Sequence, residues 1–163
     1  MSAQTQPSRT LENPPIPVQI KLAGAWTSFM FLYIYVDYLS LYKPGTVDDL
    51  LAGIVWEFEV SQTFVTTSMV LMAIPILMIV LSMALPARLN RATNLIVASL
   101  YIPFSIFNAV GESWLYFYGL AIGLEVMILG VILRTAWTWP RMPLPSNSAP
   151  VASDDRLRQQ AVA

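Results

Sequence analysis

Four long apolar stretches divide this chain, and they constrain its fold more than any other feature. They cover residues 22–42, 61–85, 91–110 and 114–137, and short polar segments separate them. At about 1.5 Å of rise per residue, roughly 20 helical residues cross the hydrocarbon core of a bilayer. Each stretch is therefore predicted to be a transmembrane helix. We expect an all-α fold, with a four-helix transmembrane bundle over residues 20–140.

Composition favours a membrane location and excludes several kinds of chemistry. Hydrophobic residues make up 56% of the chain and charged residues 12%, whereas a soluble domain has about 25% charged residues. The chain has no cysteine and no histidine, so it offers no disulfide, no Cys or His zinc site and no Ser-His or Cys-His nucleophile. We expect no metal, no cofactor and no enzymatic activity. A net charge of −1 gives no indication of a nucleic-acid partner.

The segments outside the four stretches are predicted to be disordered or interfacial. Residues 1–19 and 141–163 are polar and rich in proline, which is typical of disordered tails. Residues 46–59, between the first two spans, carry apolar side chains at helical spacing beside an acidic face. That pattern predicts a short amphipathic helix that lies in the plane of the membrane interface.

The distribution of basic residues predicts the orientation in the membrane. Eight of the nine Lys and Arg residues lie in the N-terminal flank, the loop between the second and third spans, or the C-terminal flank. Lys43 is the exception, and it lies on the other side with five acidic residues, Asp48, Asp49, Glu57, Glu59 and Glu112. By the positive-inside rule, we expect a multi-pass protein of the cell (inner or plasma) membrane with both termini in the cytoplasm.

A polar or aromatic stripe runs along each predicted span, at spacings that alternate between four and three residues. This is the period of inward-facing side chains in a left-handed helical bundle. In the second span, for example, the stripe is Gln62, Thr66, Met69 and Ala73. Together the stripes predict a polar, aromatic-lined cavity in the outer half of the bundle. Its candidate site residues are Tyr33, Asp37, Gln62, Tyr101, Ser105, Asn108, Tyr118 and Glu125.

Glu125 is the candidate with the clearest chemistry. Helical rise places it near the bilayer midplane, about level with Tyr101 and Ser105, and the sequence offers no Lys or Arg at that depth. A buried, unpaired carboxyl is expected to hold its proton. It either forms hydrogen bonds that fix helix register or serves as a binding or proton site. For Asp37 a structural or interfacial role is favoured, because water can reach it.

Two glycines of the last span form a small-xxx-small pair. Gly119 and Gly123 are four residues apart and therefore share one face of the helix. Such pairs let two helix backbones approach closely. We expect a helix-packing contact at this face, either within the chain or between copies.

Three stretches of the chain have recognisable patterns. They are Tyr-x-Tyr-x-Asp at 33–37, Asn-Arg-x-x-Asn at 90–94, and the segment 116–137 around its acidic residue. Over residues 20–140 the chain resembles a family of uncharacterised bacterial four-helix integral membrane proteins, a domain of unknown function. The resemblance implies the fold and a membrane location, and it supplies no activity. Family members often have an acidic residue at the position of Ala73.

Three functions are compatible with these features. The favoured one is a non-enzymatic membrane protein whose cavity within the bundle binds a small or lipophilic ligand. The first alternative is a proton-coupled small transporter that uses Glu125 and Asp37. The second is a structural or accessory membrane subunit, in which Gly119 and Gly123 mediate assembly with another copy or with a membrane protein partner.

Overall fold

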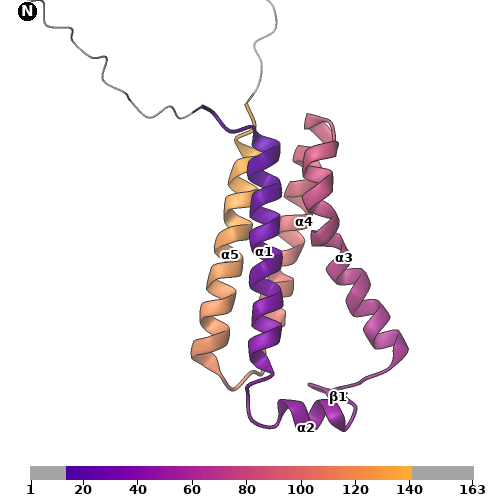
Figure 1. Ribbon diagram of the computed structural model, residues 1–163. Helices are drawn as coiled ribbons and strands as arrows, with labels where there is room; N and C mark the ends of the chain where they lie inside the picture. Colours follow the sequence, from indigo (N-terminus) through magenta and orange to yellow (C-terminus); the bar gives the residue numbers. More distant parts are fainter. Residues whose placement is uncertain (1–13, 141–163) are drawn as a thin grey trace, which may run out of the picture.

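Four long helices form the body of the protein in the computed structural model, which describes residues 14–140 (Figure 1). They are α1 (Val18–Ser40), α3 (Gln62–Ala84), α4 (Ala87–Phe107) and α5 (Leu115–Trp137). Their ends lie within about one turn of the predicted ones, so the mainly helical fold is confirmed. Most of the two tails predicted to be disordered lies outside the described residues. Of the predicted N-terminal tail 1–19, residues 14–17 are described and are not helical, and α1 begins at Val18.

The segment between α1 and α3 differs from the prediction. A six-residue helix, α2 (Thr46–Leu51), is followed by an antiparallel hairpin of β1 (Ile54–Val55) and β2 (Phe58–Glu59). The helix predicted over 46–59 is therefore wrong beyond Leu51. Gly53 follows the C-cap with a φ of 78°, the left-handed conformation that ends many helices. Trp56 begins the two-residue turn with a φ of 56°, as tight hairpin turns require.

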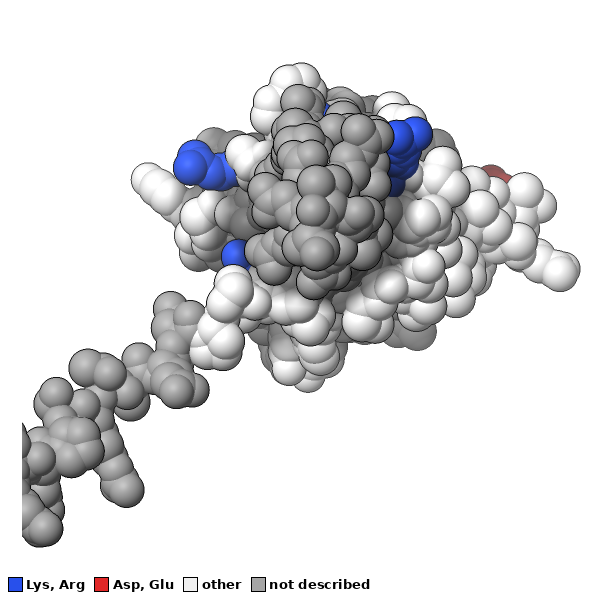
Figure 2. Space-filling model, turned by 90° about the horizontal axis from the view of Figure 1, so that it is seen from above, with Lys and Arg blue, Asp and Glu red and all other residues white. Residues whose placement is uncertain are grey.

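The long helices run alternately in opposite directions (Figure 1). α1 packs against both α3 and α5, α4 packs mainly against α5, and α3 contacts α4 much less than it contacts α1. The α2 segment, the hairpin and the α4–α5 loop lie at one end of the bundle, which we call the hairpin end. The opposite end carries Lys21, Arg88, Arg91 and Arg134, and we call it the basic end. Figure 2 looks onto the basic end and shows basic side chains around it.

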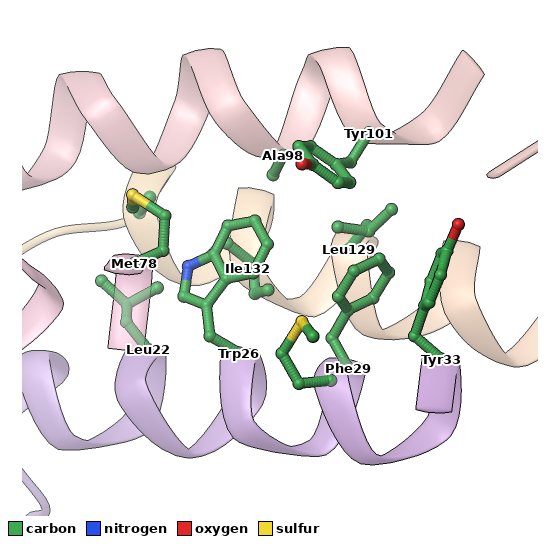
Figure 3. Close-up of a cluster of buried hydrophobic side chains, with 11 residues drawn as sticks. Leu22, Trp26, Phe29, Tyr33, Met78, Ala98, Tyr101, Leu129 and Ile132 are labelled. Carbon is green, nitrogen blue, oxygen red and sulfur yellow. The ribbon is translucent and has the colours of Figure 1, made fainter. Parts of the chain in front are cut away.

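The packed core fills the half of the bundle toward the basic end (Figure 3). Trp26 and Phe29 of α1 are fully buried and meet side chains from the other three long helices. Their rings meet edge to face, with centroids 5.8 Å apart, and Phe29 meets Tyr101 in the same way at 5.9 Å. Edge-to-face contacts are the favoured geometry of aromatic pairs, so this cluster specifies how α1 sits against α4.

Buried residues identify the inward face of each helix. In α1, α4 and α5 these faces agree with the predicted stripes, since the candidate residues Tyr33, Tyr101, Ser105 and Glu125 are buried. In α3 the predicted face is wrong. Its buried residues are Pro75, Met78 and Ser82, while Thr66 and Met69 are exposed.

The difference in α3 amounts to a rotation of the helix. The inward face is displaced by two positions from the predicted one, which is about 200° around the axis. α3 is apolar on all sides, so hydrophobic pattern alone leaves its rotation undetermined. Contacts from α4 to Ser82 and Leu71 fix the rotation instead.

Candidate functional site

A cavity of about 450 Å³ lies in the half of the bundle toward the hairpin end. Its wall comes from the last turns of α1, the first half of α3, the end of α4 and the first half of α5. The hairpin and the α4–α5 loop line its outer end. A volume of this size lies in the range of small-molecule sites, which are about 300–1,000 Å³.

Six of the eight predicted site residues line this cavity. Tyr33 and Asp37 come from α1, Ser105 and Asn108 from the end of α4, and Tyr118 and Glu125 from α5. Within each pair the spacing of three, four or seven residues places both side chains on one helix face. The structure therefore brings together side chains that are up to 92 positions apart in the sequence, as in the pair 33 and 125.

The other two predicted residues lie elsewhere. Gln62 is the first residue of α3 and is exposed outside the cavity. Tyr101 is buried in the core, and its hydroxyl donates a hydrogen bond to the carbonyl oxygen of Leu71. That carbonyl lacks its helical partner because Pro75, four residues later, has no N–H. Tyr101 therefore satisfies the backbone of α3.

A second side chain of α4 satisfies the backbone at the end of α3. Because α3 ends at Ala84, the carbonyl of Ser82 has no helical donor, and the side-chain amide of Asn90 donates to that oxygen at 2.5 Å. Asn94 donates to Asn90 Oδ1 at 2.7 Å and accepts the indole N–H of Trp26, also at 2.7 Å. This buried network joins α1, α3 and α4. It gives a structural reason for the Asn-Arg-x-x-Asn segment that sequence reasoning did not supply.

The polar groups of the cavity are incompletely paired. Asn108 donates a hydrogen bond to the Tyr33 hydroxyl. Glu125 is only 4% exposed, and Ser105 beside it is 1% exposed. The Ser105 hydroxyl has no hydrogen-bond partner within residues 14–140. Asp37 is exposed, which agrees with the expectation that water reaches it.

Only one acidic residue of the cavity has a basic partner. Glu112 forms an ion pair with Lys43 at 2.5 Å, and this is the single ion pair within the described part of the chain. Asp37 and Glu125 are close enough for their charges to interact, yet no described Lys or Arg pairs with either. The cavity wall therefore holds two carboxyls without a counter-ion.

Aromatic rings from the hairpin were missed by sequence reasoning. Trp56 and Phe58 line the cavity, with ring centroids 5.7 Å apart. Trp56 also meets Phe107 of α4 at 6.1 Å, and Phe58 stacks on Phe64 of α3 at 5.9 Å. These four rings form a continuous aromatic row from α4 to α3. The signal for them was a two-residue turn between short runs of strand-forming residues.

Gly119 and Gly123 make no close helix contact within the described residues 14–140. A Cβ atom added at either position would meet nothing within 4 Å. The expected packing contact within the chain is therefore wrong. A contact between copies stays a prediction.

Within residues 14–140, no group of three or more acidic, His or Cys side chains is placed to hold a metal ion. A sequence profile described as "Family of unknown function (DUF6326)" matches residues 18–145. The chain belongs to this family. The DUF6326 match covers all the helices and all the residues that line the cavity, and it assigns no activity. No curated protein and no solved structure matches the chain.

Proposed function

We propose that this protein is a non-enzymatic, four-span integral membrane protein whose cavity binds a small or lipophilic ligand. The observation that carries the proposal is a cavity of about 450 Å³ with Asp37 and Glu125 in its wall, neither of which has a basic partner among residues 14–140. Protein interiors are normally close-packed, and their buried polar groups are normally paired. A space of this size beside unpaired polar groups is better explained by a ligand than by packing.

Two helices support the membrane location by their length and composition. α3 and α5 are long and apolar enough to cross a membrane. Only 11% and 22% of the residues in their most apolar windows are buried, so they differ from the core helices of soluble proteins. α1 has 23 residues and α4 has 21. At about 1.5 Å per residue, these helices also exceed the hydrocarbon thickness of about 30 Å.

The outward faces of α1 and α4 support two further spans. Phe31 is 60% exposed on α1, and Leu100 is 64% exposed on α4. Asn90 and Asn94, which lower the apolar character of α4, are buried and hydrogen-bonded. Lys21, Arg88 and Arg91 lie near the basic end, where long side chains reach lipid headgroups. In this arrangement the basic end and both termini face the cytoplasm.

The best alternative is a proton-coupled small transporter. It is favoured by the position of Glu125, which is almost fully buried and shares the cavity with Asp37. Ionisable residues inside membrane proteins often belong to proton relays. In this alternative the Glu125 proton leaves and returns in each cycle, so Glu125→Gln abolishes a flux driven by a pH gradient while the fold persists.

A cavity-filling substitution tests the ligand-binding function. Ala121 is 5% exposed and lines the cavity, so Ala121→Leu fills part of the space. Ala92→Leu makes the same change on an exposed face of α4 and is the matched control. The three proteins are purified in lipid nanodiscs, and a set of small lipophilic compounds is screened for an increase in Tm. A ligand present at 100 times its Kd stabilises by about 2.7 kcal/mol.

We expect some compounds to raise the Tm of the wild type and of Ala92→Leu equally. The same compounds should raise the Tm of Ala121→Leu much less. The proposal fails if no compound stabilises the wild type, or if Ala121→Leu is stabilised to the same extent. Circular dichroism and size-exclusion chromatography check that each variant is folded. Ser68→Leu fills the opposite wall, and it replaces Ala121→Leu if that variant does not fold.

A further inference from the structure

We infer that the ligand of this cavity is an organic cation, an ammonium or related onium group on a lipophilic body. The inference rests on the proposed ligand-binding function and names the chemical class of its ligand. It follows from the charges of the wall, the unpaired polar groups beside them and the rings that surround both.

The wall is acidic and has no basic side chain of its own. Asp37, Glu112 and Glu125 line the cavity, and none of its lining residues is Lys or Arg. Lys43 neutralises Glu112 from outside the lining, which leaves Asp37 and Glu125. Glu125 is almost fully buried, so its ionised form is costly unless an opposite charge accompanies it, and the exposed Asp37 adds a second carboxyl to the wall. A cationic ligand supplies the charge that the described residues do not.

A second polar group of the wall lies beside Glu125. Ser105 is 1% exposed and lines the cavity, and its hydroxyl has no partner among the described residues. Buried hydroxyls are normally hydrogen-bonded. Since Glu125 and Ser105 lie side by side, the Ser105 hydroxyl can donate to the ionised Glu125 carboxyl that faces a bound onium group.

The rings of the wall select the same sign of charge. The aromatic lining consists of Tyr33, Trp56, Phe58, Phe64, Phe104, Phe107 and Tyr118. The face of an aromatic ring attracts cations and repels anions. Onium groups are commonly recognised by aromatic cages for this reason. An anion would meet repulsion from both the carboxyls and the ring faces, and a neutral lipid tail would gain nothing from the carboxyls.

Proton and ligand compete for the same carboxyls. A bound cation favours ionised Glu125 and Asp37, so binding releases protons. The other titratable groups that face the cavity are Tyr33, Tyr118 and Glu112 with its partner Lys43. If one proton is displaced for each cation bound, the apparent Kd rises by about tenfold per pH unit below the titration of the carboxyl.

Tetraphenylphosphonium is a suitable probe, because tetraphenylborate has nearly the same shape and the opposite charge. Binding of radiolabelled tetraphenylphosphonium is measured on protein in phosphatidylcholine nanodiscs, and binding to empty nanodiscs is subtracted. We expect saturable binding that tetrabutylammonium displaces and tetraphenylborate does not. Glu125→Gln and Asp37→Asn should each weaken binding by about tenfold or more. Glu59→Gln removes an exposed hairpin carboxylate outside the cavity and should change nothing.

Glu125→Asp keeps the charge and should retain binding if Glu125→Gln does not fold. The cation inference is overturned if tetraphenylborate displaces the probe as well, or if Glu125→Gln and Asp37→Asn both bind like the wild type. The two proposals can fail separately. If the probe does not bind, but neutral compounds still raise the Tm of the wild type and not that of Ala121→Leu, only the cation inference fails. If Ala121→Leu binds every compound as the wild type does, the ligand-binding function fails too.

Discussion

The hydroxyl of Tyr101 donates a hydrogen bond to the carbonyl oxygen of Leu71, the one carbonyl that Pro75 leaves without its helical donor. Asn90 does the same for Ser82, whose carbonyl has no helical donor because α3 ends at Ala84. Both donors belong to α4 and both acceptors to α3. These two helices share few other contacts, so the hydrogen bonds explain how α3 is held in register with α4.

Removing the Tyr101 hydroxyl should destabilise the fold through this bond. We expect Tyr101→Phe to lower the free energy of unfolding in mild detergent by about 1 kcal/mol, the scale of hydrogen bonds between membrane helices. Pro75→Ala restores the missing N–H, so in that background Tyr101→Phe should cost much less. Tyr116→Phe, at a residue that is 97% exposed, is the control and should be silent. An equal cost of Tyr101→Phe in both backgrounds would contradict the assignment.

The buried network around Asn94 should be more sensitive. Asn94→Ala removes the acceptor of the Trp26 indole N–H and the donor to the Asn90 side-chain oxygen, and we expect a loss of about 1–3 kcal/mol. Combining it with Trp26→Phe should cost less than the sum of the two single changes, because they remove the same bond. Thr93→Ala is the control, since the Thr93 hydroxyl bonds only to its own helix, at Leu89. Simple additivity of Asn94→Ala and Trp26→Phe would show that the bond contributes nothing.

Gly123→Leu should leave the folded monomer intact. A new side chain there meets open space, and leucine favours helix over glycine by several tenths of a kcal/mol. If Gly119 and Gly123 form the contact between copies that an accessory subunit would use, Gly123→Leu should also convert the oligomer to a smaller species. Native mass spectrometry measures this, with Gly24→Leu as the control at another open glycine. An unfolded Gly123→Leu monomer would mean that this face is packed within the chain.

Reporter fusions test the four-span topology. A reporter placed after Arg9, between Arg88 and Arg91, or after Arg158 should report the cytoplasm. Insertions within residues 46–57 should report the opposite side. Alkaline phosphatase and green fluorescent protein, which are active on opposite sides of a bacterial inner membrane, give paired readouts. A single position on the unexpected side is enough to reject the four-span arrangement.

Sequence reasoning located the long helices because each is a sustained apolar run between polar segments. It also identified the inward faces of α1, α4 and α5, where polar residues recur at the bundle period. It failed for α3, because a helix that is apolar all round carries no rotational signal. The hairpin was missed because a short apolar run fits either helix or strand until Gly53 and Trp56 adopt positive φ.

Tyr101 illustrates a different limit. Its position on the α4 stripe was correct, but its role depends on a carbonyl freed by Pro75 on another helix. No spacing within α4 contains that information. The hairpin aromatics could not be assigned to the cavity for a similar reason, since they reach the site only because the chain reverses at Trp56.

Trp56 has a practical consequence for future experiments. It is the tryptophan among the cavity-lining residues, whereas the Trp26 indole is hydrogen-bonded to Asn94 in the core. Indole fluorescence shifts with the polarity around the ring, so an occupant of the cavity should alter the emission of Trp56 and leave that of Trp26 unchanged. Subtracting the spectrum of Trp56→Phe isolates this signal. The chain thus contains its own optical probe, placed at the site whose occupant is sought.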